Sequence, residues 1–173
     1  MKILVSVFNN LYTDQRVEKF CKTLHENAYQ IEVIGNNWGG NPEMKRPYPF
    51  SRISLQSKKL RFAYLEFQWK LFLVLLKKAD RNTILHANDL DALLPNYLVS
   101  KIKGIPLVWD SHEIFTEMPT VTNRWVQHVW RLLENALIRK IKYFITANDS
   151  YANWFETNYK IKRPIVIRNF PQK

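Results

Sequence analysis

Ile105-Pro-Leu-Val-Trp-Asp-Ser-His-Glu-Ile-Phe115 is the stretch that decides the fold, because a continuous apolar run leads without a spacer into four polar residues. Such a run is typical of a strand buried on both faces of a parallel sheet. Asp110, Ser111, His112 and Glu113 then stand at the carboxyl end of that strand, where open α/β sheets bind ligands. The stretch therefore predicts both a parallel sheet and the edge that carries its site.

Six further apolar runs have the composition of strands, and stretches with helical periodicity separate them. Strands that alternate with helices form parallel sheets with right-handed crossovers. The expected strands are residues 3–8, 31–34, 52–55, 83–86, 106–109, 143–146 and 165–167. The expected helices begin at Thr13 or Asp14, at Arg61, after Asp89, at Arg124 and at Asn148 or Asp149. We predict an α/β fold, a Rossmann-like three-layer αβα sandwich with a mostly parallel sheet, in which Pro95 kinks the third helix or delays its start.

The composition places the chain among ordinary globular proteins. Its 173 residues, of which 46% are hydrophobic, suffice for one domain with a substantial core. The longest strictly apolar run, residues 71–76, is far shorter than the ~20 residues that cross a bilayer. The first residues lack the pattern of a signal peptide, so we expect a cytoplasmic protein. The single cysteine, Cys21, is expected to be a small core residue rather than a nucleophile.

The net charge of +11 is concentrated in two segments. Residues 45–81 hold ten Lys and Arg against two acidic residues, and residues 137–173 hold eight against two. Regional basic surface attracts the phosphates of lipids, nucleic acids or charged metabolites, although a solvated, solubilising face is an equally common explanation. No nucleic-acid motif accompanies the charge, so we expect no nucleic-acid partner.

Polar residues follow most of the expected strands. They are Asn9-Asn10, Asn36-Asn37, His86-Ala-Asn-Asp89, Asp110-Ser-His-Glu113, Asn148-Asp149 and Arg168-Asn169. Parallel strands end at the same edge of a sheet, so these side chains should share one edge. Asn and Asp also cap helices whatever the function, but capping does not explain His86, His112 or Arg168.

These motifs together resemble the acceptor-side Rossmann-like domain of GT-B glycosyltransferases of family 4. The resemblance rests on Asp14 and Arg16 in the first helix, His86-Ala-Asn-Asp89, Lys103-Gly-Ile-Pro106 before Val108-Trp-Asp-Ser-His-Glu113, Asn148-Asp-Ser150 and Val166-Ile-Arg-Asn-Phe-Pro171. It implies that residues 1–168 form the N-terminal half of a GT-B fold, that residues 169–173 begin an interdomain linker, and that the donor-binding domain is absent. Glu18 and Glu26 match the spacing of the family's two glutamates, but they lie along the first helix and we regard the match as a coincidence.

The resemblance also implies the site. The histidine corresponding to His112 lies beside the transferred sugar in the resembling enzymes, so His112 is the expected catalytic residue, with an imidazole that can donate or accept a proton near neutral pH. The expected substrate-binding residues are Asn9, Asn10, Arg16, His86, Asn88, Asp89, Asp110, Ser111 and Glu113. Asp110 and Glu113 are expected to orient the loop rather than to transfer protons. The first loop lacks the glycines of many relatives, which weakens any expectation of a backbone anion nest there.

Structural roles compete with these assignments. His112 could simply bond a neighbouring carboxylate, and His86 could be satisfied by backbone. Arg16 could form a surface pair with Asp14 or Glu18. Asn88 and Asp89 could only cap a helix. No cysteine or carboxylate stands at metal-ligand spacing with either histidine, so we expect no bound metal.

The resemblance implies a retaining glycosyltransferase that moves a sugar from a nucleotide-sugar donor to a glycan or lipid-linked acceptor in cell-envelope polysaccharide synthesis. The nucleotide sugar is a substrate, no cofactor is expected, and the isolated chain should be inactive without its C-terminal domain. A peripheral membrane or phosphate-binding Rossmann-like module without transferase activity is the alternative. The aromatic, basic stretch 61–78 favours contact with an anionic membrane surface at the inner face of the cell membrane, although core packing is its more ordinary role.

Overall fold

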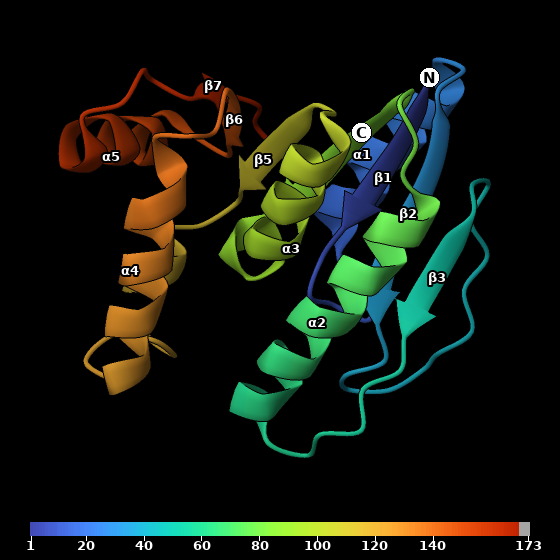
Figure 1. Cartoon of the computed structure of the whole chain (residues 1–173), viewed down its shortest axis with the longest axis horizontal. Coiled ribbons are helices and arrows are strands. Elements are labelled where there is room, and N and C mark those ends of the chain that lie inside the picture. The colour runs from blue at the N-terminus through green and yellow to red at the C-terminus, as the bar shows by residue number, and fades with distance from the viewer. Residues whose placement is uncertain (170–173) are drawn as a thin grey trace.

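The computed structural model describes residues 1–169, which form one seven-stranded sheet and five α-helices (Figure 1). Of the expected linker, residues 170–173 lie outside the described part. The strands are β1 (Lys2–Ser6), β2 (Gln30–Asn36), β3 (Phe50–Ile53), β4 (Thr83–Asn88), β5 (Leu107–Ser111), β6 (Tyr143–Thr146) and β7 (Ile165–Val166). The helices are α1 (Gln15–Glu26), α2 (Leu60–Lys78), α3 (Asp89–Lys103), α4 (Trp125–Ile138) and α5 (Asp149–Tyr159), with a short 3-10 turn, η1 (Phe115–Glu117).

All strand pairs are parallel, in the order β3-β2-β1-β4-β5-β6-β7. The chain starts at β1, moves outward to β2 and β3, and then crosses back to β4 before it continues through β5, β6 and β7. This order confirms the predicted Rossmann-like α/β fold. The strand order reverses between β1 and β4, and such a switch point creates a binding crevice at the carboxyl ends of the strands.

The two faces of the sheet are covered unequally. Leu4 and Leu85 point to the face on which α2, α3, α4 and α5 contribute to one large apolar core. Val5 and Val33 point to the other face, where α1 packs with Val17 and forms a smaller core. Figure 1 shows α2 and α3 in front of the sheet and α1 behind it. Cys21 of α1 is fully buried in the smaller core, and burial raises the pKa of its thiol to about 12, as expected for a core residue.

The observed helix starts agree with the predicted ones, but some observed strand ends differ from the prediction. The side chain of Asp14 accepts a hydrogen bond from the Val17 amide and caps α1, and Asn148 caps α5 in the same way. The predicted strand 106–109 ended too early, because Asp110 and Ser111 still pair with β6. The polar residues that should follow β5 are therefore partly inside it, where the ladder fixes their direction.

Pro95 lies inside α3 without delaying its start. Proline has no N–H, so the carbonyl of Asp91 four residues earlier lacks its helical donor. The side-chain amide of Gln68 in α2 donates to that carbonyl instead. This replacement hydrogen bond connects two packed helices, so the sequence around Pro95 did not predict it.

Candidate functional site

The carboxyl edge of the sheet holds a group of charged side chains centred on Asp110 at the end of β5. Arg16 reaches it from α1, with its Nη2 2.8 Å from Asp110 Oδ1 and 3.2 Å from Oδ2. Arg16 Nη1 also donates to the carbonyl of Ile167 at 2.8 Å. The alternative of a surface pair between Arg16 and Asp14 or Glu18 was therefore wrong, and Arg16 belongs to the edge.

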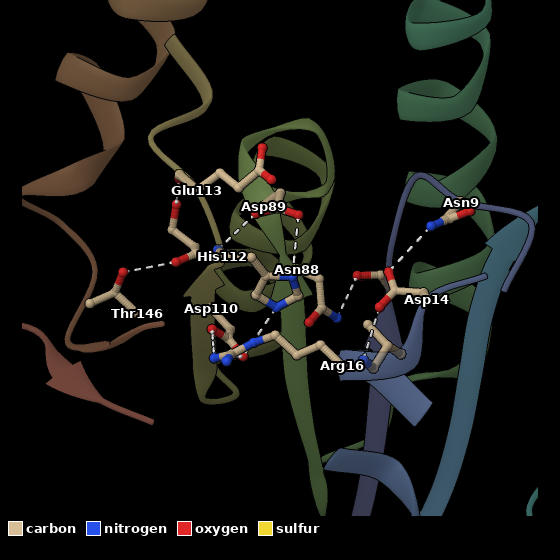
Figure 2. A network of polar contacts seen from close by, with 12 residues as sticks. Asn9, Asp14, Arg16, Asn88, Asp89, Asp110, His112, Glu113 and Thr146 are labelled. Carbon is tan, nitrogen blue, oxygen red and sulfur yellow. Dashed lines mark hydrogen bonds and ion pairs between the residues drawn. The ribbon is translucent and has the colours of Figure 1, made fainter. Parts of the chain in front are cut away.

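His112 lies between two carboxylates, as Figure 2 shows. Its Nε2 is 3.3 Å from Asp110 Oδ2, and its Nδ1 is 3.5 Å from Asp89 Oδ2. Its backbone N–H donates to Asp89 Oδ1 at 2.9 Å. Asp89 adopts a left-handed backbone, with φ of 58°, at the first residue of α3. Such a conformation costs an Asp side chain on the order of 1 kcal/mol and persists where surrounding contacts hold it, as they do here.

The charged side chains of this group shift the pKa values of one another. Burial alone would raise the pKa of Asp110, but His112 and Arg16 outweigh it and lower that pKa to about 2. Burial alone would lower the pKa of His112, but the charges of Asp89 and Asp110 raise it above its ordinary value. Burial raises the pKa of Asp89 in spite of His112. The imidazole is thus biased toward its protonated, hydrogen-bond-donating form in a mostly desolvated setting.

Besides Asp110, three of the predicted substrate-binding residues are buried, namely His86, Asn88 and Ser111. His86 is 2% exposed, stacks against Phe20 with ring centroids 4.4 Å apart, and has a pKa lowered to about 4, mainly by burial. Asn88 donates to the carbonyl of Ser6 at 3.1 Å, and Ser111 Oγ donates to the carbonyl of Glu113 at 2.8 Å. Asn88 and Ser111 thus make internal hydrogen bonds, whereas His86 Nε2 is buried without a hydrogen-bond partner among the described residues.

The remaining predicted residues lie in the loops of the edge. Asn9 donates to Asp14 Oδ2 at 3.3 Å, and the Asn10 side chain accepts from the Tyr12 amide at 3.0 Å. This loop lies against β2 at Gly35, where a Cβ would come within 2.5 Å of the Asn9 carbonyl. A glycine is required at that close approach. The Glu113 side chain is exposed beside His112, in a position to meet a ligand.

A pocket of about 390 Å³ opens beside the charged group, between α1 and the residues that follow β7. Arg16 and Asp110 form part of its wall, together with Phe20 and Ile167. Volumes of this order are typical of small-molecule sites. The edge therefore offers a hollow with a desolvated cation and carboxylate at one side.

The sequence interpretation missed Asp91 as a member of this region. Asp91 is 7% exposed, its Oδ1 has no hydrogen-bond partner among the described residues, and burial raises its pKa well above the ordinary value. Its position two residues after Asp89, in the first turn of α3, was the available signal. Only the packing of α2 against α3 shows that Asp91 is enclosed.

Residues 1–169 contain neither a clustered metal site nor a membrane-spanning helix. No group of three or more His, Cys, Asp or Glu side chains in that range is placed to hold a metal ion. No helix there combines the length and apolarity needed to span a membrane.

Comparison with known proteins places this geometry in a family. The family model of Glycosyltransferase Family 4 matches residues 14–170. Sucrose-phosphate synthase from Thermosynechococcus elongatus superimposes with a TM-score of 0.75 at 9% identity, over 97% of this chain and 48% of that one. Os79 from O. sativa in complex with UDP gives 0.60 at 10% identity, over 92% and 50%.

The apo form of the lipopolysaccharide outer core galactosyltransferase WaaB gives a TM-score of 0.59 at 11% identity, over 98% of this chain and 46% of that one. No curated protein sequence matches the chain. The chain spans about half the length of these three solved structures, which are GT-B glycosyltransferases. The predicted fold class is thereby confirmed, and the chain belongs to glycosyltransferase family 4.

Proposed function

We propose that this domain serves retaining transfer of a sugar from a nucleotide-sugar donor to a glycan or lipid-linked acceptor, in the synthesis of a cell-envelope polysaccharide. The observation that carries the proposal is the placement of His112 between Asp89 and Asp110 at the carboxyl edge, beside a pocket. Family membership and a solved neighbour that carries UDP support a nucleotide-sugar donor.

His112 is proposed to act beside the transferred sugar through the positive charge of its imidazolium, because both ring nitrogens face carboxylates, Nε2 toward Asp110 and Nδ1 toward Asp89. In retaining transfer, the bond between the anomeric carbon and the diphosphate oxygen breaks, the acceptor oxygen forms its bond to that carbon from the same face, and the proton of the acceptor hydroxyl passes to the departing diphosphate. Asp89 and Asp110 raise the pKa of His112 and fix the position of its ring, so the ring needs no reorganisation when charge develops on the diphosphate. A positive charge that is held in place before the reaction stabilises the charge of the transition state more than that of the ground state.

The test is His112→Ala in the protein that contains both the acceptor side and the donor side. We expect kcat to fall by a factor of about 10² or more, because general acid–base and donor groups contribute typically ~10²–10⁴. His128→Ala, which removes an exposed histidine from α4, is the matched control and should leave kcat unchanged. Near-normal turnover in His112→Ala, with an intact circular dichroism spectrum, would remove His112 from the mechanism.

The donor is proposed to bind mainly to a second domain, so that the 173-residue chain alone has no transferase activity. The basis is that the chain spans about half of the GT-B structures it resembles. Calorimetric titration of the chain with nucleotide sugars should give weak or undetectable binding. Strong, stoichiometric binding would contradict the division of labour while leaving the role of His112 open to its own test.

Peripheral attachment to an anionic membrane surface is a second proposal, favoured by the start of α2. Lys58, Lys59 and Arg61 are exposed there beside Phe62, which is 49% exposed. Each basic side chain near an anionic surface contributes about 1 kcal/mol, and salt screens the attraction. Binding to anionic vesicles should fall as salt rises, and equal sedimentation with neutral vesicles would overturn the electrostatic account.

A further inference from the structure

Helix α2 is apolar on both its buried and its exposed sides. Phe67 and Leu71 are fully buried against the sheet, as expected of a helix in this fold. On the opposite side, Leu65 is 67% exposed and Trp69 is 62% exposed. A surface helix normally carries polar residues on the side away from the core. The apolar outer side of α2 therefore calls for a partner that the core does not supply.

The exposed side of α2 faces α4 across a groove of about 500 Å³. We call it the α2–α4 groove and define it by its main apolar lining residues, Phe62, Leu65, Leu94, Trp125, Val129 and Leu133. Several of these remain open to solvent, with Trp125 69% exposed and Val129 52% exposed. A concave surface lined almost wholly by apolar groups suits a hydrocarbon ligand better than a polar one.

Positive charge surrounds the end of the groove at which both helices begin. Arg61 lines the groove, with its guanidinium carbon 4.9 Å from the centroid of the Phe62 ring. Lys59 and Arg124 are exposed at the residues that precede α2 and α4, and neither helix has an acidic residue in its first turn. An anionic group is therefore favoured at this end of the groove and a hydrocarbon chain along it.

The groove and the candidate site lie on either side of the first turn of α3. Gln68, which lines the groove, donates its side-chain amide to the backbone carbonyl of Asp91. Asp89, two residues earlier, accepts the backbone N–H of His112. Figure 1 shows the first turns of α2 and α4 at the end of the sheet toward which the β1, β2 and β3 arrows point. A molecule that lies in the groove can thus reach past one helical turn to the site.

We infer that the acceptor is an amphiphile whose hydrocarbon chain lies in the α2–α4 groove and whose anionic head is held near Arg61, with the sugar-accepting group directed to His112. The inference deepens the proposed function. That the amphiphile in the groove is the acceptor rests on the proposed function. The inference differs from peripheral attachment, because it requires one chain in one groove and not a general affinity for a surface.

The first experiment measures binding of hexyl, octyl and decyl phosphate to the 173-residue chain, each below its critical micelle concentration. Calorimetry gives the affinity, and the fluorescence of Trp125 and Trp130 reports occupancy because both line the groove. Each buried methylene should strengthen binding roughly fourfold, the factor that corresponds to ~0.8 kcal/mol. Inorganic phosphate should bind far more weakly than decyl phosphate. Equal affinity for all three alkyl phosphates, or no saturable binding, would overturn the inference.

The second experiment compares two double variants with the same change in charge. Leu65→Glu with Val129→Glu places carboxylates in the groove, and we expect at least tenfold weaker binding of decyl phosphate. Leu132→Glu with Ile102→Glu changes two residues that are 73% and 61% exposed outside the groove, and binding should stay within twofold. Equal losses in both would reduce the effect to net charge and contradict the groove.

The third experiment separates this inference from the proposed function. His112→Ala should bind decyl phosphate within twofold of the unaltered chain, because the histidine lies beyond the groove. If the alkyl phosphates bind in the groove but the two-domain protein transfers no sugar, the proposed function fails and the groove stands. If His112→Ala retains turnover, only the proposed role of His112 fails. If vesicles sediment with the chain while monomeric alkyl phosphates show no chain-length dependence, the surface is a membrane contact only and the inference fails.

Discussion

The two sides of the first turn of α3 are built on opposite principles. On the site side, charged groups are buried and paired: the Asp110 side chain is 3% exposed and the Arg16 side chain 12%. On the groove side, apolar groups such as Leu65 and Trp125 are exposed and have water where the core would give them neighbours. Both arrangements depart from the usual distribution of polar and apolar groups in a globular protein.

The two regions differ in when favourable free energy is gained, on folding at the site side and on ligand binding at the groove side. A buried charge is tolerated only when partners compensate for its lost hydration, so the site side must be ordered before any ligand arrives. Exposed apolar surface needs no partner to be tolerated, and it gains free energy only when a ligand covers it. Removing the carboxylate that Arg16 and His112 share should therefore lower stability, whereas mutations on the groove side should lower binding.

Asp110→Ala should have the largest effect on stability. Removing this carboxylate leaves Arg16 and His112 mostly buried without their shared partner, and breaking such a pair costs about 3–5 kcal/mol of unfolding free energy. Urea unfolding measures the loss. Lys22→Ala removes an exposed pair with Glu26 on the same helix as Arg16 and should cost no more than about 0.5 kcal/mol. Similar costs for the two variants would refute the contrast between buried and exposed charge.

Glu134→Gln tests the inner side of α4, the helix whose outer side lines the groove. Glu134 is fully buried, and burial raises its pKa from 4.5 to about 7 although Tyr159 and Thr116 donate to it. The unfolded chain therefore releases this proton at lower pH than the folded chain, and wild-type stability falls as pH rises from about 4.5 to 7.

Glutamine cannot ionise, so Glu134→Gln should be more stable than the wild type by about 1–3 kcal/mol at pH 8, with the difference shrinking toward pH 4. Unfolding free energies measured across this pH range give the difference. Glu117→Gln, at an exposed residue that pairs with Arg131, is the control and should change the unfolding free energy by no more than about 0.5 kcal/mol. A constant offset for Glu134→Gln across the range would contradict a raised pKa.

Leu65→Glu should have the smallest effect, within about 0.5 kcal/mol, because its side chain is exposed and loses little on replacement. Leu71→Ala on the buried side of the same helix should cost about 2–5 kcal/mol, since it leaves a cavity. Thermal and urea unfolding of both variants measure the contrast. A large loss in Leu65→Glu would mean that the groove side of α2 supports the fold, and the comparison between the two regions would fail.

The sequence predicted most elements of the fold because the relevant signals are local. Apolar runs, helical periodicity and capping residues such as Asp14 and Asn148 each act within a few residues of the chain. The strand ends were less certain. Asp110 and Ser111 extend β5 because they pair with β6, and that pairing connects residues 35 positions apart.

The site was predicted as a set of residue types along one edge, and the structure sorted that set. Asp89, Asp110, His112 and Arg16 come together, while His86 and Asn88 lie beneath them. The sequence could not distinguish the residues at the site from those buried beneath it, because burial of a strand-end histidine depends on which helix residue covers it. Phe20 of α1 decides it for His86.

By itself, the sequence determined the alternation of strands and helices, the edge that carries polar residues and the family to which the chain belongs. Only the tertiary structure decided that Arg16 pairs with Asp110, 94 residues away, and that the apolar outer sides of α2 and α4 enclose one groove. The physical reason is that pattern and capping act between neighbours in the chain. Pairing of distant charges and the shape of a groove depend on crossovers that bring remote segments to the same edge of the sheet.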